Sequence, residues 1–153
     1  MLLAAASAAG CARRKGRGFP GYAFIANAGS RTVAAVDLNA FVLARQIGME
    51  GAPSEVLRHI SRPAAFVLIP GSGVVCEIDA ERLAISRKTR LGGPALSMLS
   101  PPDGRSLWVL QTRSLVRLET ERLRAVETIQ LPAVAAARDI RPLRYNSVLR
   151  RCR

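Results

Sequence analysis

The sequence is poor in the residues that carry most enzyme chemistry. Its 153 residues include one histidine, His59, and three widely separated cysteines, Cys11, Cys76 and Cys152. A single histidine argues against a His-based metal cluster or a Ser-His-Asp triad within this chain. The cysteines are too few and too scattered for a disulfide framework or a CxxC zinc site. We therefore expect no metal ion, no cofactor and no catalytic constellation.

Long hydrophobic runs are also lacking. No apolar stretch approaches the roughly 18 residues that a transmembrane helix needs. Hydrophobic residues nevertheless make up 49% of the chain against 22% charged residues, a balance that argues against disorder. At this length the chain is one ordinary domain or a piece of a larger one.

The basic charge is concentrated in two tails. Lysine and arginine total 23 against 11 acidic residues, which gives a net charge of +12. Residues 1–20 contribute +4 and residues 138–153 contribute +5, so residues 21–137 carry only +3. Aromatic residues make up only 5% of the chain, so a groove in which bases stack is unsupported. This distribution argues against a nucleic-acid partner.

The first twenty residues resemble an export signal followed by a basic tether. A short apolar run is closed by small residues and Cys11, as in a bacterial lipobox, where the cysteine is lipidated. The pattern lacks a basic segment at the start, and Ala8 stands where lipoboxes usually carry leucine. The alternative is an Ala-rich helix or a poorly ordered start. The export interpretation predicts a periplasmic or cell-envelope protein that meets the membrane only through a lipid anchor on Cys11.

Residues 21–137 contain a pattern that recurs about every forty residues. Three segments, which begin at Tyr22, Ala65 and Leu107, each contain an apolar run, a polar turn, a second apolar run and a closing acid. The closing acids are Asp37, Asp79 and Glu119, spaced by 42 and then 40 residues. Each acid precedes a third short strand, predicted at 41–47, 83–89 and 123–129. A proline-marked turn follows, and then a fourth strand, predicted at 55–59 and 95–99.

Short strands in units of about forty residues are typical of β-propeller blades. The sequence therefore predicts an all-β fold, a partial β-propeller of about three four-stranded antiparallel blades. Asp103 and Gly104 lie between two predicted strands and favour a tight hairpin turn, because Asp-Gly readily adopts positive φ. The alternative is an unrelated β-sandwich whose spacing is coincidental.

The repeat resembles the YVTN-type β-propeller family. The segment from Tyr22 to Asn27 stands where that family has its Tyr-Val-Thr-Asn strand, and Val36-Asp37 matches its Ile-Asp pair. Residues 51–53 match its Gly-x-Pro turn, and residues 100–105 its Ser-Pro-Asp-Gly-Arg turn with one proline added. The likeness is strong in the first repeat and fades in the second and third. The residues that carry the repeat signature are Asn27, Asp37, Pro53, Asp79, Pro94, Asp103, Gly104 and Glu119.

Three blades are too few to close a propeller, which takes about four to eight. The chain is expected to be a fragment of a longer propeller, to self-associate, or to form an open arc. Residues 138–153 lose the repeat and become strongly basic. That change indicates either a truncated or frame-shifted gene end or a natural basic tail.

The residues favour binding over catalysis. The recurring acids could bind a cation or polar ligand near a central channel, or satisfy turn amides. His59 is expected at the surface or in a turn, and Cys76 is expected to be a buried, inert thiol. We expect a non-catalytic binding or scaffold module of the bacterial envelope, with a protein, carbohydrate or small ligand as partner. The alternative is part of a propeller enzyme, lactonase-like or quinoprotein-like, whose catalytic residues lie in missing blades.

Overall fold

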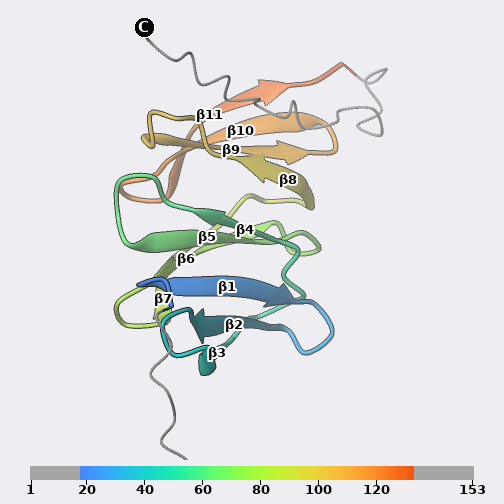
Figure 1. Cartoon of the computed structure of the whole chain (residues 1–153). Helices are drawn as coiled ribbons and strands as arrows, with labels where there is room; N and C mark the ends of the chain where they lie inside the picture. The colour runs from blue at the N-terminus through green and yellow to red at the C-terminus, as the bar shows by residue number, and fades with distance from the viewer. Residues whose placement is uncertain (1–17, 133–153) are drawn as a thin grey trace, which may run out of the picture.

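The computed structural model describes residues 18–132, which form eleven β-strands and no helix. The strands make three antiparallel sheets that follow one another along the chain and are stacked as three layers (Figure 1). We call these sheets the first, second and third blade. The first blade contains β1 (Tyr22–Asn27), β2 (Thr32–Asp37) and β3 (Val42–Gly48). The second contains β4 (Glu55–Arg58), β5 (Ala64–Ile69), β6 (Val74–Asp79) and β7 (Ala84–Arg90). The third contains β8 (Ala95–Leu99), β9 (Ser106–Gln111), β10 (Ser114–Glu119) and β11 (Arg124–Gln130).

The all-β, three-sheet prediction is confirmed, with one correction to how strands are assigned to blades. The predicted fourth strand of each repeat belongs to the following blade, because β4 pairs with β5 and β8 pairs with β9. The proline-marked turn carries the chain from the outer strand of one blade to the first strand of the next. Within the described residues the first blade therefore has three strands, and only the second and third have the expected four.

Burial explains why some strands are apolar throughout and others are not. Every residue of β5 is buried, and so is every residue of β6 except Asp79, because both faces of the second blade are covered by a neighbouring blade. The last strands, β3, β7 and β11, are almost wholly exposed. They form the outer rim, which explains their arginine, lysine and glutamine side chains.

Two apolar cores join the blades. Between the first and second blades, Val33 and partly buried Phe24 pack with Val67 and Ile69. Between the second and third blades, Phe66 packs with two groups of residues. Its own blade contributes Leu68 and Val75, and the third blade contributes Leu107, Val109, Val116 and Leu118. The described part of the chain is therefore held together mainly by apolar contact between adjacent sheets.

The turn before each outer strand has the same geometry in all three blades. The fourth residue after each closing acid has positive φ, namely Phe41 at 55°, Leu83 at 50° and Leu123 at 51°. Each outer strand also has a register shift at the matching place, opposite Ala35/Val36, Glu77/Ile78 and Arg117/Leu118. A left-handed residue next to a bulge redirects the chain into the outer strand.

No helix among the described residues is long and apolar enough to cross a membrane.

Candidate binding clefts

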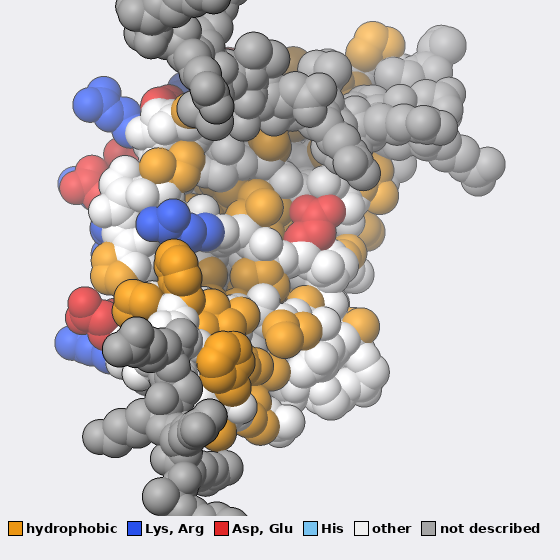
Figure 2. Space-filling view, in the orientation of Figure 1, with side chains coloured by type: hydrophobic (Ala, Val, Ile, Leu, Met, Phe, Trp, Pro, Cys, Tyr) orange, Lys and Arg blue, Asp and Glu red, His pale blue; other side chains and the backbone are white. Residues whose placement is uncertain are grey.

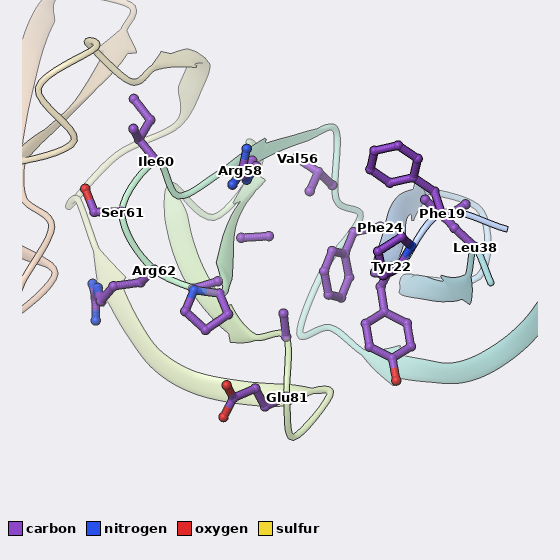
Figure 3. A pocket seen from close by; sticks show the side chains of 16 residues that line it. Phe19, Tyr22, Phe24, Leu38, Val56, Arg58, Ile60, Ser61, Arg62 and Glu81 are labelled. Atoms are coloured by element: carbon purple, nitrogen blue, oxygen red, sulfur yellow. The ribbon is translucent and has the colours of Figure 1, made fainter.

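A cleft of about 890 Å³ lies between the first and second blades (Figure 3). Its apolar lining comes from both blades, with Phe19, Tyr22 and Phe24 on one side and Val56 and Ile60 on the other. Polar side chains gather at the end near the β4–β5 turn, where Arg58, Ser61, Arg62 and Glu81 line the cleft. Such a lining suits a ligand with apolar side chains and a few polar groups.

The cleft lies beside an open strand edge. In the second and third blades, β4 and β8 occupy the inner edge, next to β5 and β9. The first blade begins at β1, which has β2 on one side and no strand on the other within the described residues. Phe24 of β1 lies opposite Val56 of β4, and Tyr22 lines the cleft on the β1 side (Figure 3). The cleft therefore lies where an inner strand of the first blade belongs.

The second blade shows which groups of β1 point into this space. The backbone carbonyls of Ala64 and Leu68 accept hydrogen bonds from the first-strand side, from His59 N at 2.8 Å and Ser54 N at 2.9 Å. Tyr22 and Ala64 occupy matching positions, since each pairs with the closing acid of its own blade. Backbone groups of alternate residues point to the same side of a strand. The N–H and C=O groups of Tyr22, Phe24 and Ala26 accordingly point to the open edge.

A second cleft, of about 680 Å³, lies between the second and third blades and is far more polar. Beneath it, buried Glu77 forms ion pairs with Arg62 at 3.3 Å and Arg87 at 3.5 Å. The same arginines donate hydrogen bonds to the third blade. Arg62 bonds the Thr120 carbonyl at 2.8 Å, and Arg87 bonds the Glu121 carbonyl. This cluster joins two blades, which gives it a structural role. A glutamate in the middle of the apolar strand β6 is the sequence signal that could have revealed it.

His59 lies in the connection between β4 and β5, one of its two expected places, but it is buried, so the expectation of a surface position is wrong. Its ring is 3% exposed and lies 5.3 Å from the Phe66 ring. Ser61 N donates to Nδ1 at 3.1 Å, while the Arg62 guanidinium lies 3.1–3.2 Å from Nε2. Burial and the nearby Arg62 charge lower the pKa of His59 below its usual 6.5. The protonated ring is thus disfavoured, because its positive charge would be buried beside the Arg62 guanidinium.

The recurring acids do not converge on one site. The Asp37 carboxylate accepts from Asn39 N at 2.7 Å and Ala40 N at 3.1 Å. Asp79 accepts from the backbone of the residues that follow it in the same way, at 2.8 and 2.9 Å, and these bonds lower its pKa. Glu119 instead lines the second cleft. No group of three or more His, Cys, Asp or Glu residues that could hold a metal exists within residues 18–132. Two of the acids therefore satisfy turn amides.

The other signature residues lie mainly in turns. Asp103 accepts from Arg105 N at 3.0 Å, and Gly104 has a φ of 64° beside Ser61 of the second blade. Asn27 ends β1, Pro53 is fully buried, and Pro94 is exposed just before β8.

The cysteines supply no reactive site within the described residues. Cys76 is buried, and burial raises the pKa of its thiol to about 11. The lipidation candidate Cys11 lies outside the described residues, as does Cys152.

Sequence reasoning missed the cleft beside β1. Phe19 lies before the first repeat, and Val56 and Ile60 lie on another blade, so no local pattern joins them.

No protein-family model matches the chain, and no curated protein matches its sequence. Solved structures do match. Hydrazine synthase of Kuenenia stuttgartiensis has a TM-score of 0.66 at 21% identity, over 72% of this chain and 34% of that one. The dihydro-heme d1 dehydrogenase NirN has a TM-score of 0.65 at 19% identity, over 72% of this chain and 25% of its own. The WD40 domain of Toxoplasma gondii coronin has a TM-score of 0.63 at 10% identity, over 73% of this chain and 31% of its own.

These likenesses concern the fold alone, because the identities are low. The chain spans about a third or less of each of these neighbours, and the YVTN family remains a resemblance that no family model supports. WD40 domains are built from four-stranded blades around a central axis. With three successive antiparallel sheets and neighbours of this kind, the chain has the fold of part of a β-propeller.

Proposed function

We propose that this chain is a non-catalytic binding or scaffold module whose ligand is an extended polypeptide segment. The observation that supports this function is the open edge of β1 beside an apolar cleft of about 890 Å³. A bound strand would pair with the backbone of Tyr22, Phe24 and Ala26 and place alternate side chains against Phe24 and Val56. Strand addition of this kind draws affinity from main-chain hydrogen bonds and specificity from side-chain pockets.

One charge at the cleft favours a segment that ends in an acidic residue. Arg58 is exposed at the end of the cleft near the β4–β5 turn, whereas Arg62 at that end is already paired with Glu77 and Glu81 adds a negative charge. Because residues 21–137 carry only +3, electrostatics should contribute little beyond this end. Added salt should therefore weaken binding only mildly.

The test uses a labelled peptide of alternating threonine and valine with a glutamate at its end. We expect saturable binding to the full chain, measured by fluorescence anisotropy, and at least a ten-fold loss when alternate peptide nitrogens are methylated. Ala26→Pro removes one N–H from the open edge without breaking a β1–β2 bond, since that N–H points away from β2. Ala52→Pro places the same change in an exposed loop and serves as the control. Binding that neither methylation nor Ala26→Pro weakens would contradict strand addition.

A propeller enzyme whose catalytic residues lie in other blades is the second candidate. It is favoured by the neighbours named as a synthase and a dehydrogenase, of which this chain spans 34% and 25%. Reading the genomic DNA beyond codon 153 in every frame tests it. Further repeats with added His, Asp or Glu clusters support the enzyme, and their absence supports the module.

We also propose that the module acts at the cell envelope, anchored through Cys11. The support is the apolar, small-residue sequence that precedes this cysteine. The full chain expressed in bacteria should fractionate with membranes, and Cys11→Ala should release it. Unchanged fractionation after the substitution would contradict the anchor.

A further inference from the structure

One position carries an aromatic side chain in every blade. Phe24, Phe66 and Trp108 are spaced by 42 residues and pair with matching residues of the next strand, Ala35, Glu77 and Arg117. Phe24 packs against the second blade, and Phe66 is fully buried against the third. Each of these two aromatics thus lies beneath the blade that follows. Trp108 is the member of the series with no following blade in the described residues.

The face of the third blade that carries Trp108 is therefore only half-covered. Trp108, Leu110 and Leu115 of this face are each of intermediate burial, whereas Leu107 and Val109 on the opposite face are fully buried. The Arg117 guanidinium lies 5.9 Å from the centre of the Trp108 ring. On this face Trp108, Leu110 and Leu115 lie beside the Arg117–Glu127 ion pair, at 2.9 Å, and half-exposed apolar side chains with the strand pattern of a covered face indicate an interaction surface.

The opposite end of the arc offers a matching surface. The outer face of the first blade carries Ala23, Ile25, Ala34 and Val36, of which Ile25 is 49% exposed and Ala34 is buried. These residues hold the positions that Leu107, Val109, Val116 and Leu118 hold where the third blade covers Phe66. Figure 2 shows hydrophobic side chains gathered over the first and second blades on the side turned to the viewer.

The sizes of the side chains on the two surfaces are complementary. Two alanines in the first blade replace a leucine and a valine of the third, and the aromatic that needs cover is a tryptophan in place of a phenylalanine. The larger Trp108 side chain would thus pack on a surface of the first blade whose side chains are smaller. Close packing of this kind stabilises native interfaces.

We propose that two copies of this chain join head to tail into a six-bladed ring, with Trp108 of each copy packed on the first blade of the other. Six blades lie within the range of closed propellers, and a head-to-tail contact that closes forms a ring. The inference rests on the proposed function, because it names the occupant of the cleft beside β1. That occupant is residues 133–137 of the second copy, Ala-Val-Ala-Ala-Ala. They follow Pro132 as β4 follows Pro53 and β8 follows Pro94, so they would supply the inner strand of the next blade.

The first measurement is the mass of the full chain by sedimentation and light scattering. We expect twice the chain mass. Dilution should shift tryptophan emission to the red, because dissociation exposes Trp108, the single tryptophan. Ile25→Arg should give monomers. Ile85→Arg changes a residue 39% exposed on the outer strand of the second blade and should leave the dimer intact. A monomer at every concentration, or an open-ended polymer, overturns the ring.

Mixing two variants tests the head-to-tail arrangement. Trp108→Glu should also be monomeric, but equal amounts of Ile25→Arg and Trp108→Glu should form dimers, because one junction then keeps both native surfaces. Failure of the mixture to dimerise, with both variants folded by circular dichroism, overturns the arrangement. If either variant is unfolded, Leu110→Arg replaces Trp108→Glu and Val36→Arg replaces Ile25→Arg, with the same expected outcomes.

The threonine-valine peptide separates this inference from the proposed function. If the second copy fills the cleft, monomeric Ile25→Arg should bind the peptide at least ten-fold more tightly than the native chain. Equal binding by a native chain that is monomeric overturns the ring and leaves the strand-binding function standing. A dimer in which neither form binds the peptide supports the ring and contradicts strand binding as a general function.

Discussion

Truncation of Phe66 tests whether contact between blades holds this fold together. Phe66 is fully buried between the second and third blades, among Leu68, Leu107 and Val109. Replacing a buried phenylalanine by alanine costs about 3–5 kcal/mol, through lost transfer energy and the cavity left behind. A domain of this size has only about 5–15 kcal/mol of stability. Phe66→Ala should therefore remove a large part of the free energy of unfolding.

The assay is urea denaturation followed by circular dichroism. With an m value of about 2 kcal/mol/M, the expected loss lowers the midpoint by about 1.5–2.5 M. Phe24→Ala should cost less, about 1–3 kcal/mol, because that ring is only partly buried. Phe41→Ala is the matched control, since its side chain is 69% exposed and the change should stay within about 0.5 kcal/mol. Equal midpoints for Phe66→Ala and Phe41→Ala would refute inter-blade packing as the main source of stability.

Three further predictions concern single groups. Because the pKa of His59 is lowered in the fold, the unfolded chain binds more protons below about pH 6.5. The thermal midpoint should therefore be steady above pH 7 and fall as the pH drops below 6.5. His59→Gln should flatten this dependence of the thermal midpoint on pH. An unchanged dependence would show that other groups cause it. Gly73 has a φ of 59°, and a Cβ there would lie 1.8 Å from the Gly93 carbonyl oxygen. Gly73→Ala should therefore lower the free energy of unfolding, measured by urea denaturation, by well over the ~1–2 kcal/mol that a left-handed backbone costs alone. Gly29→Ala, which meets open space, should be nearly neutral, and a similar effect of both would contradict the close approach of Gly73 to Gly93. Glu77→Gln should cost about 1–3 kcal/mol, less than a fully buried ion pair, because Arg62 and Arg87 keep part of their hydration. A free energy of unfolding within about 0.5 kcal/mol of the native value would show that the cluster contributes little.

The repeat made the strands and turns predictable because they depend on short-range patterns. The outer strands predicted at 41–47, 83–89 and 123–129 lie within a residue of β3, β7 and β11, and the regular positions of Asp37 and Asp79 reflect the turn amides that they bind. The fourth strands predicted at 55–59 and 95–99 correspond to β4 and β8. The sequence pattern did not reveal that the blade is offset by one strand from the repeat, since strand pairing joins residues across the proline turn.

The residues of the clefts could not be found in this way. His59 is buried only because Arg62, Phe66 and the third blade surround it, and its neighbours in the sequence are exposed. The cleft beside β1 is a property of where the first blade begins and of the distance between β1 and β4, and these depend on how the sheets stack. Periodicity along the chain therefore determined the number, order and turns of the strands. Only the tertiary structure decided which edge is open and which aromatic is uncovered, because both depend on which surfaces meet when the blades pack.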